Sequence, residues 1–163
     1  MLNMWLSPTN KEDIDYWVAE RHYLKSRGSC AASIRMWFLD GSKEQFVDDT
    51  KKMGAMLWTI PSAPAFDNQT LLELKRMYFI DDTEANIESK ALAMARRYIR
   101  NNYPKIKGLI AYSSTGQGHD GGIYKADNWF SIGIRKGSTW TRKSRPNRAD
   151  RDTSDKILWV RSP

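Results

Sequence analysis

The sequence contains a single cysteine, Cys30, so no disulfide can form within the chain, and this usage suits a reducing cytoplasm. The chain has only two histidines, and neither lies close in sequence to the other or to the cysteine, so we expect no metal site. No stretch approaches the roughly 18 apolar residues that span a bilayer, and residues 1–10 lack the pattern of a signal peptide. These absences predict a cytoplasmic protein without membrane attachment.

A glycine-rich phosphate loop of the Walker type is also missing, which argues against nucleotide hydrolysis. The chain does have enough apolar residues for a core: 40% of its 163 residues are hydrophobic and 12% are aromatic. A disordered chain would be poorer in such residues. Because no internal repeat or low-complexity linker divides the sequence, we expect one domain over residues 1–163.

Positive charge is concentrated near the end of the sequence. The net charge is +7, and residues 135–163 contain nine Lys or Arg against three Asp, whereas the rest of the chain is nearly balanced. A local excess of this kind favours nucleic acid as a partner, although a solvated charge run is the simpler alternative. The basic segment, about residues 135–156, combines cations that neutralise phosphates with an aromatic residue that can stack on a base: Trp140, Arg142, Lys143, Arg145 and Arg148.

The hydrophobic pattern predicts an α/β fold with a mixed sheet. An amphipathic helix is expected over residues 11–25, and a longer helix with an apolar stripe over 86–101, ended by Pro104. A brief helix is expected over 123–128. Strands are expected over 34–39, 53–60, 71–80, 107–113, 130–134 and 157–160.

The start of the longer helix is a candidate phosphate site. Free backbone N–H groups and the positive end of the helix dipole favour an anion there. Ser89 and Lys90 add a hydroxyl donor and a positive charge just after Asn86. Taken alone, the segment is explained more simply by Asn86 or Thr83 acting as a helix cap and by a solvated Lys90.

A second candidate site is the glycine-rich segment 116–122, which has four glycines in seven residues. Glycines let a backbone turn sharply and approach a ligand closely. They place His119 and Asp120 in a loop after a strand, and Tyr124 follows on the brief helix. The other histidine, His22, precedes Tyr23 late in the first helix. A lone histidine is more often structural than catalytic, so these residues are candidates only.

Three segments, residues 73–82, 86–89 and 118–129, resemble the bacteriophage Mom family of DNA-modification proteins, and the His22-Tyr23 pair is similar to a feature of that family. The resemblance spans roughly residues 20–135. It implies a GNAT-like acyltransferase fold: a mixed, mostly antiparallel central sheet flanked by helices. It also implies an enzyme that converts adenine in double-stranded DNA to N6-carbamoylmethyladenine in the bacterial host cell, which shields phage DNA from restriction.

The same resemblance implies roles for the candidate residues. Asn86, Ser89 and Lys90 would hold the pyrophosphate of acetyl-CoA or a related acyl donor. Tyr124 matches the tyrosine that many GNAT enzymes use as the general acid toward the leaving thiolate.

The resemblance also implies a base pocket lined by His22, Tyr23 and His119. The family usually carries an aspartate where this chain has Ser113-Ser114. If that aspartate is the catalytic base, Ser114 cannot replace it at neutral pH, and Asp120 or His119 must serve.

Two other functions are compatible with these residues. A GNAT enzyme of this kind could instead acylate an amine of tRNA or protein. Alternatively, the chain could be a noncatalytic DNA-binding module that acts through its basic segment. Loss of modification without loss of DNA binding in Tyr124→Phe would argue against the binding module.

Overall fold

The computed structural model of the chain describes residues 3–22, 32–41, 51–81, 83–115, 121–136 and 154–163. Within these ranges the chain forms three helices, α1 (Asp13–Arg21), α2 (Ile87–Asn102) and α3 (Gly122–Ala126). The same ranges contain seven strands: β1 (Met4–Thr9), β2 (Ile34–Asp40), β3 (Lys52–Thr59), β4 (Leu71–Phe79), β5 (Gly108–Ser114), β6 (Phe130–Arg135) and β7 (Lys156–Arg161).

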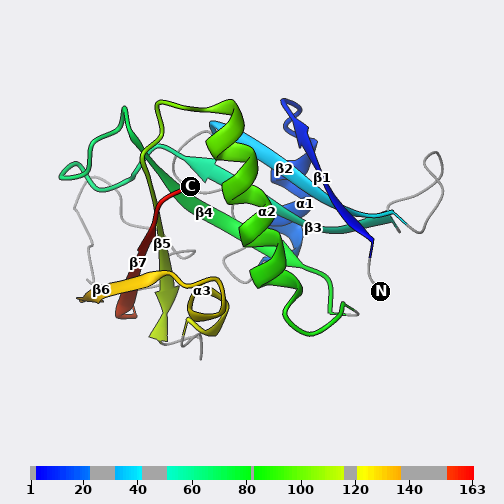
Figure 1. Cartoon of the computed structure of the whole chain (residues 1–163). Helices are drawn as coiled ribbons and strands as arrows, with labels where there is room; N and C mark the ends of the chain where they lie inside the picture. The colour runs from blue at the N-terminus through cyan, green and yellow to red at the C-terminus, as the bar shows by residue number, and fades with distance from the viewer. Residues whose placement is uncertain (1–2, 23–31, 42–50, 82, 116–120, 137–153) are drawn as a thin grey trace, which may run out of the picture.

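All seven strands form one sheet, in the order β1-β2-β3-β4-β5-β7-β6 (Figure 1). Neighbouring strands are antiparallel except β4 and β5, which are parallel. Parallel neighbours need a crossover connection, and α2 provides it. The expected mixed, mostly antiparallel sheet flanked by helices is confirmed.

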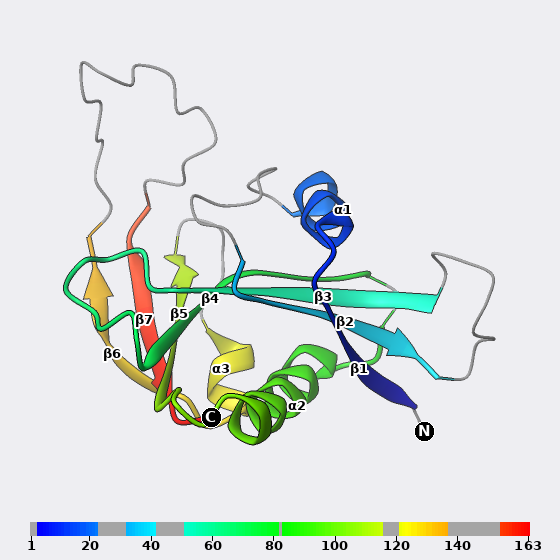
Figure 2. The same ribbon diagram turned by 90° about the horizontal axis from the view of Figure 1, so that it is seen from above.

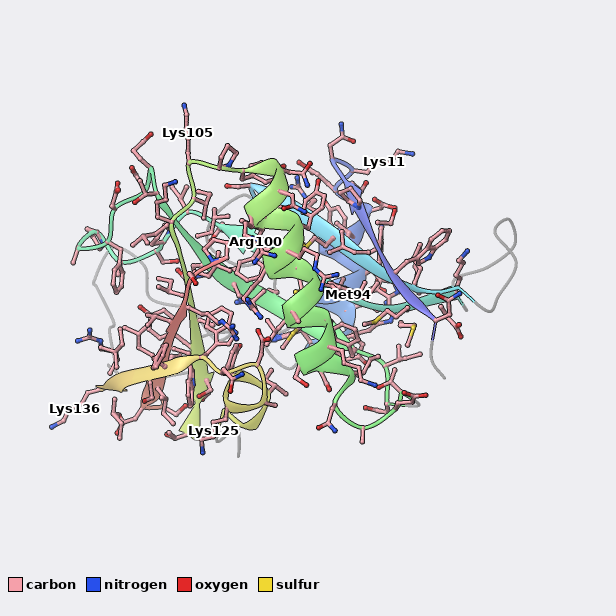
Figure 3. The ribbon with its side chains drawn as sticks, viewed as in Figure 1. Lys11, Met94, Arg100, Lys105, Lys125 and Lys136 are labelled. Carbon is pink, nitrogen blue, oxygen red and sulfur yellow. The ribbon has the colours of Figure 1, made fainter. Side chains whose placement is uncertain are left out.

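Helix α2 packs on one face of the sheet through a single apolar stripe. Its side chains at helical spacing are fully buried and join the main core with residues of β2, β3 and β4: Ile87, Ala91, Leu92, Ala95 and Ile99. Polar and charged side chains lie on the remaining faces, and Figure 3 shows Arg100 on this helix. No helix of the described ranges has the length and apolar character needed to cross a membrane.

Helix α1 covers the opposite face of the sheet, as Figure 2 shows. Ile14, Trp17 and Val18 pack there against Trp37 and Leu57 of the sheet in a second, smaller core. The Trp17 ring meets the Trp37 ring edge-on, with 5.2 Å between centroids. The sheet is therefore covered on both faces beside β2, β3 and β4.

The structure differs from the sequence-based expectation at the N-terminal part of the chain. Strand β1 is not among the strands that the sequence predicts, and Pro8 lies within it. It forms because it pairs only with β2, at the edge of the sheet, where a proline is tolerated. Helix α1 ends at Arg21, earlier than expected, because His22 adopts an extended backbone (φ −70°, ψ 145°).

Candidate active site

The sheet opens between β4 and β5. These strands pair over four residues only, and the last pair is Leu74 with Ala111. Beyond it β4 continues beside β3 and β5 beside β7, so β4 and β5 separate; we call this divergence the fork (Figure 1). Lys75 is an extra residue in β4 at this point, because the partners of Leu74 and Arg76 are consecutive residues of β3.

Two of the predicted segments meet at the open end of the fork. The start of α2 and the whole of α3 lie there, on the same face of the sheet (Figures 1 and 2). Tyr124 of α3 belongs to the core cluster that contains the buried stripe of α2. The structure thus brings the candidate phosphate site and Tyr124 to one side of the fork.

The first turn of α2 is built around Asn86, which adopts a left-handed backbone (φ 67°) and makes no side-chain cap hydrogen bond. Ser89 donates its hydroxyl to the Asn86 carbonyl at 3.0 Å. Lys90 Nζ lies 3.5 Å from the Glu84 carboxylate, and both side chains are about half exposed. Asn86 therefore occupies the N-cap position, as the simpler interpretation expects, but its side chain makes no capping hydrogen bond.

This turn fits a phosphate group through its backbone. The first N–H groups of a helix have no acceptor inside it, and the helix dipole favours an anion at that end. The side chains add little net positive charge, because the Glu84 carboxylate forms an ion pair with the Lys90 ammonium and Glu88 lies on the same turn. The donors at this turn are its backbone N–H groups, the Lys90 ammonium and the Ser89 hydroxyl, which here donates to the Asn86 carbonyl. The Ile87 N–H already donates to the Glu84 carbonyl at 3.3 Å.

Tyr124 is buried between two tryptophan rings. Its ring stacks on Trp159 of β7, with centroids 5.8 Å apart and planes at 21°. Trp129 meets it edge-on at 5.4 Å. The Trp159 indole N–H donates to the Ser113 hydroxyl at 2.9 Å, which fixes that ring against the end of β5.

Ser114, the last residue of β5, is also buried. Its hydroxyl is hydrogen-bonded to the Ser154 hydroxyl, just before β7 begins. A serine hydroxyl stays protonated at neutral pH, so Ser114 supplies a hydrogen-bonding group here and no proton-accepting base.

The face of the fork that looks toward α1 carries polar residues to which the sequence analysis gave no role. Glu73 of β4 is buried, accepts the Ser62 N–H at 2.8 Å, and has Lys75 Nζ at 3.8 Å. Tyr112 of β5 shares this face with Glu73; burial and then the Glu73 charge raise the pKa of its phenol, and Arg135 partly offsets this. The sequence signal that could have identified Glu73 is its charge inside a mostly apolar strand.

The remaining predicted site residues lie apart from Tyr124 or outside the described ranges. His22 directly follows α1, the helix that covers the sheet face opposite α2 (Figure 2), and its N–H donates to the Val18 carbonyl at 2.8 Å. The others lie outside the residues that the structure describes: Tyr23, His119, Asp120, Trp140, Arg142, Lys143, Arg145 and Arg148.

The basic segment connects two neighbouring strands. β6 ends at Arg135 and β7 begins at Lys156, and these two residues are paired in the sheet. Figure 3 shows Lys136, just beyond β6, pointing away from the protein. Among the described residues no group of three or more His, Cys, Asp or Glu is placed to hold a metal ion.

The forked sheet, with α2 and α3 on one face of the fork, is the fold of GNAT family acetyltransferases. The structure matches NAA60 of Arabidopsis thaliana in complex with acetyl-CoA over 98% of each chain, with a TM-score of 0.64 and 10% identity. It matches a GNAT family acetyltransferase of Elizabethkingia anophelis with acetyl-CoA bound over 99% of each chain, with a TM-score of 0.59 and 13% identity. At these identities the likeness establishes the fold alone.

The chain belongs to the Mom protein family, whose model matches residues 3–158. It is similar to the methylcarbamoylase Mom of Escherichia phage Mu, with 36% identity over 67 residues. That alignment covers 41% of this chain and 28% of the phage Mu protein. The resemblance to the Mom family and the GNAT-like fold predicted from the sequence are both confirmed.

Proposed function

We propose that this protein is a transferase that modifies adenine in double-stranded DNA, with N6-carbamoylmethyladenine as the product. Membership of the Mom family, together with a GNAT fold in which α3, the helix that carries Tyr124, lies beside the fork (Figure 1), is the observation that supports this most. The name of the phage Mu relative, a methylcarbamoylase, agrees with a group transfer of this kind. We place the activity in the cytoplasm of the bacterial host, where modified DNA would resist restriction.

The acceptor chemistry requires a positioned base. The adenine amino group is conjugated with its ring and must lose a proton as it attacks. It is also paired inside the duplex, so the base must be flipped out at a cost of about a few kcal/mol. Ser114 does not meet the requirement, so we assign proton acceptance to His119 or Asp120, and the base pocket to His22, Tyr23 and His119.

The donor in this proposal is acetyl-CoA or a related acyl thioester. Asn86, Ser89 and Lys90 would hold its pyrophosphate at the start of α2, and Tyr124 would give a proton to the leaving thiolate. A bound acyl thioester would supply an activated acyl group, and plain acetyl transfer would join the adenine N6 to a carbonyl carbon. The carbamoylmethyl product has N6 bonded to a CH2 carbon instead, so it requires a donor with a leaving group on that carbon, together with a source of the amide nitrogen.

DNA backbone contacts are assigned to the basic segment, through Trp140, Arg142, Lys143, Arg145 and Arg148. Such contacts position a protein on the duplex without reading its sequence. Replacing Arg142 with glutamine should lower the slope of log affinity against log salt by about 1, as measured by fluorescence anisotropy on duplex DNA. An unchanged slope would remove Arg142 from the interface.

Nucleoside mass spectrometry on plasmid DNA from cells that express the protein tests the reaction directly. A new adenine species with the carbamoylmethyl mass is expected, and an acetyl mass would point to plain acetyl transfer. Tyr124→Phe should lower the yield about 100-fold or more. Tyr103→Phe, which changes a partly exposed tyrosine after α2, is the matched control and should leave the yield unchanged.

Unmodified DNA from abundant, folded protein would refute DNA modification. The alternative acceptor would then be an amine of tRNA or protein, acylated by an enzyme with the same GNAT fold. The same mass-spectrometric comparison, made on tRNA nucleosides and on digested protein, separates these two acceptors.

A further inference from the structure

Asp127, just after α3, is buried, and its carboxylate contacts side chains from α2, from β7 and from the segment that follows α3. Arg96 of α2 donates from Nε and Nη2, each at 2.8 Å. The Trp129 indole N–H donates to Oδ2 at 2.8 Å. Arg161 Nη1 of β7 lies 3.6 Å from Oδ1 and also donates to the Asp127 carbonyl oxygen. One side chain therefore ties α3 to α2 and β7.

This linkage matters because α3 is only five residues long. A helix of that length does not hold its own conformation in water and depends on tertiary contacts. Both rings that touch Tyr124 are fixed by hydrogen bonds of their indole N–H groups, Trp159 to Ser113 and Trp129 to Asp127. The Asp127 carboxylate thus determines where the Trp129 edge lies against the Tyr124 ring.

We propose that Asp127 is a positioning residue for Tyr124 and acts through Trp129. Its paired carboxylate holds the indole, and the indole holds the phenol in the orientation from which it transfers a proton at the fork. This inference rests on the proposed function. A displacement of about 1 Å in a catalytic group costs about 100-fold in rate, so the linkage has a direct chemical consequence.

A second buried ion pair in the same chain provides the matched control. Asp15 of α1 accepts two hydrogen bonds from Arg35, at 2.8 and 3.1 Å. The side chains of this pair are 12% and 4% exposed, against 12% and 6% for Arg96 and Asp127. Asp15→Asn and Asp127→Asn therefore break comparable pairs, and only Asp127 contacts a ring that packs on Tyr124.

The experiment uses full-length protein labelled with carbon-13 at the tyrosine rings. The Tyr124 signal is assigned by its loss in Tyr124→Phe, and its chemical shift, which reports the position of the ring against its tryptophan neighbours, is compared between variants by NMR. Asp127→Asn should move the signal, and should lower adenine modification per folded protein about 10-fold or more. Trp129→Phe keeps a ring but removes the N–H, and should act in the same direction. Asp15→Asn should change neither readout.

The positioning role is overturned if the Tyr124 signal stays at its original position in both Asp127→Asn and Trp129→Phe. It is also overturned if Asp15→Asn loses as much modification as Asp127→Asn at an equal loss of stability. Should Asp127→Asn fail to fold, Trp129→Phe decides. Because the NMR readout does not use the reaction, retained modification in Tyr124→Phe would refute the proposed role of Tyr124 and leave the positioning test intact.

Discussion

Replacing Gly121 with alanine should destabilise the protein by an amount that the geometry of α3 predicts. Gly121 precedes α3 at φ +81°, and an added Cβ would lie 2.1 Å from Cζ2 of Trp159. A left-handed backbone costs an alanine about 1–2 kcal/mol. Overpacking against a buried ring costs about 1–3 kcal/mol more. The free energy of unfolding should therefore fall by about 2–5 kcal/mol in urea denaturation.

A double-mutant cycle separates the two contributions. Trp159→Phe removes the ring atoms that the new Cβ would meet, so in that background Gly121→Ala should cost only the backbone share. The expected coupling between the two substitutions is about 1–3 kcal/mol. Gly133→Ala is a control, because Gly133 has φ +135° and nothing within 4 Å of its added Cβ. A coupling below about 0.5 kcal/mol would show that Trp159 does not pack on Gly121. It would also refute the described packing of the Trp159 ring on Tyr124.

Three further predictions concern titratable side chains. Burial raises the pKa of the Tyr112 phenol above its usual 10.0, so this residue contributes fully to the free energy of unfolding below pH 10.0. That contribution is lost as the pH rises toward the pKa of the folded state. Tyr112→Phe should therefore flatten the decline of stability with pH in urea unfolding. Thr70→Val should raise the pKa of Asp67, which the Thr70 hydroxyl lowers, in a carboxyl NMR titration. Lys90→Gln should weaken CoA binding in calorimetry, and Glu84→Gln should strengthen it. Each substitution should change the free energy of unfolding by less than about 0.5 kcal/mol.

Most strands and the main helix could be predicted from the sequence because local pattern and tertiary environment agree there. The buried stripe of α2 follows the spacing of its apolar residues, and the strand before it, β4, has six apolar or aromatic residues out of nine. Strand β1 could not be predicted, because its partner β2, and not its own pattern, makes it a strand. The bulge at Lys75 depends likewise on the register with β3.

The candidate site was predictable only in part. Tyr124 and the start of α2 are candidates from the sequence, because a glycine-rich segment and a helix start have recognisable local sequence patterns. Glu73 has no such pattern, and only its charge within a mostly apolar strand distinguishes it. Its placement beside Tyr112 depends on which strands become neighbours, and that pairing joins residues far apart in the chain.

The sequence by itself determined the α/β class, the basic segment and the relationship to the Mom family, because these depend on composition, local periodicity and short motifs. The tertiary structure alone decided that β4 and β5 separate after Leu74, and that Asp127 joins α2, α3 and β7 beside Tyr124. The physical reason is that hydrogen bonds and ring contacts between distant residues depend on the register and packing of whole elements. No local stretch of sequence specifies that arrangement.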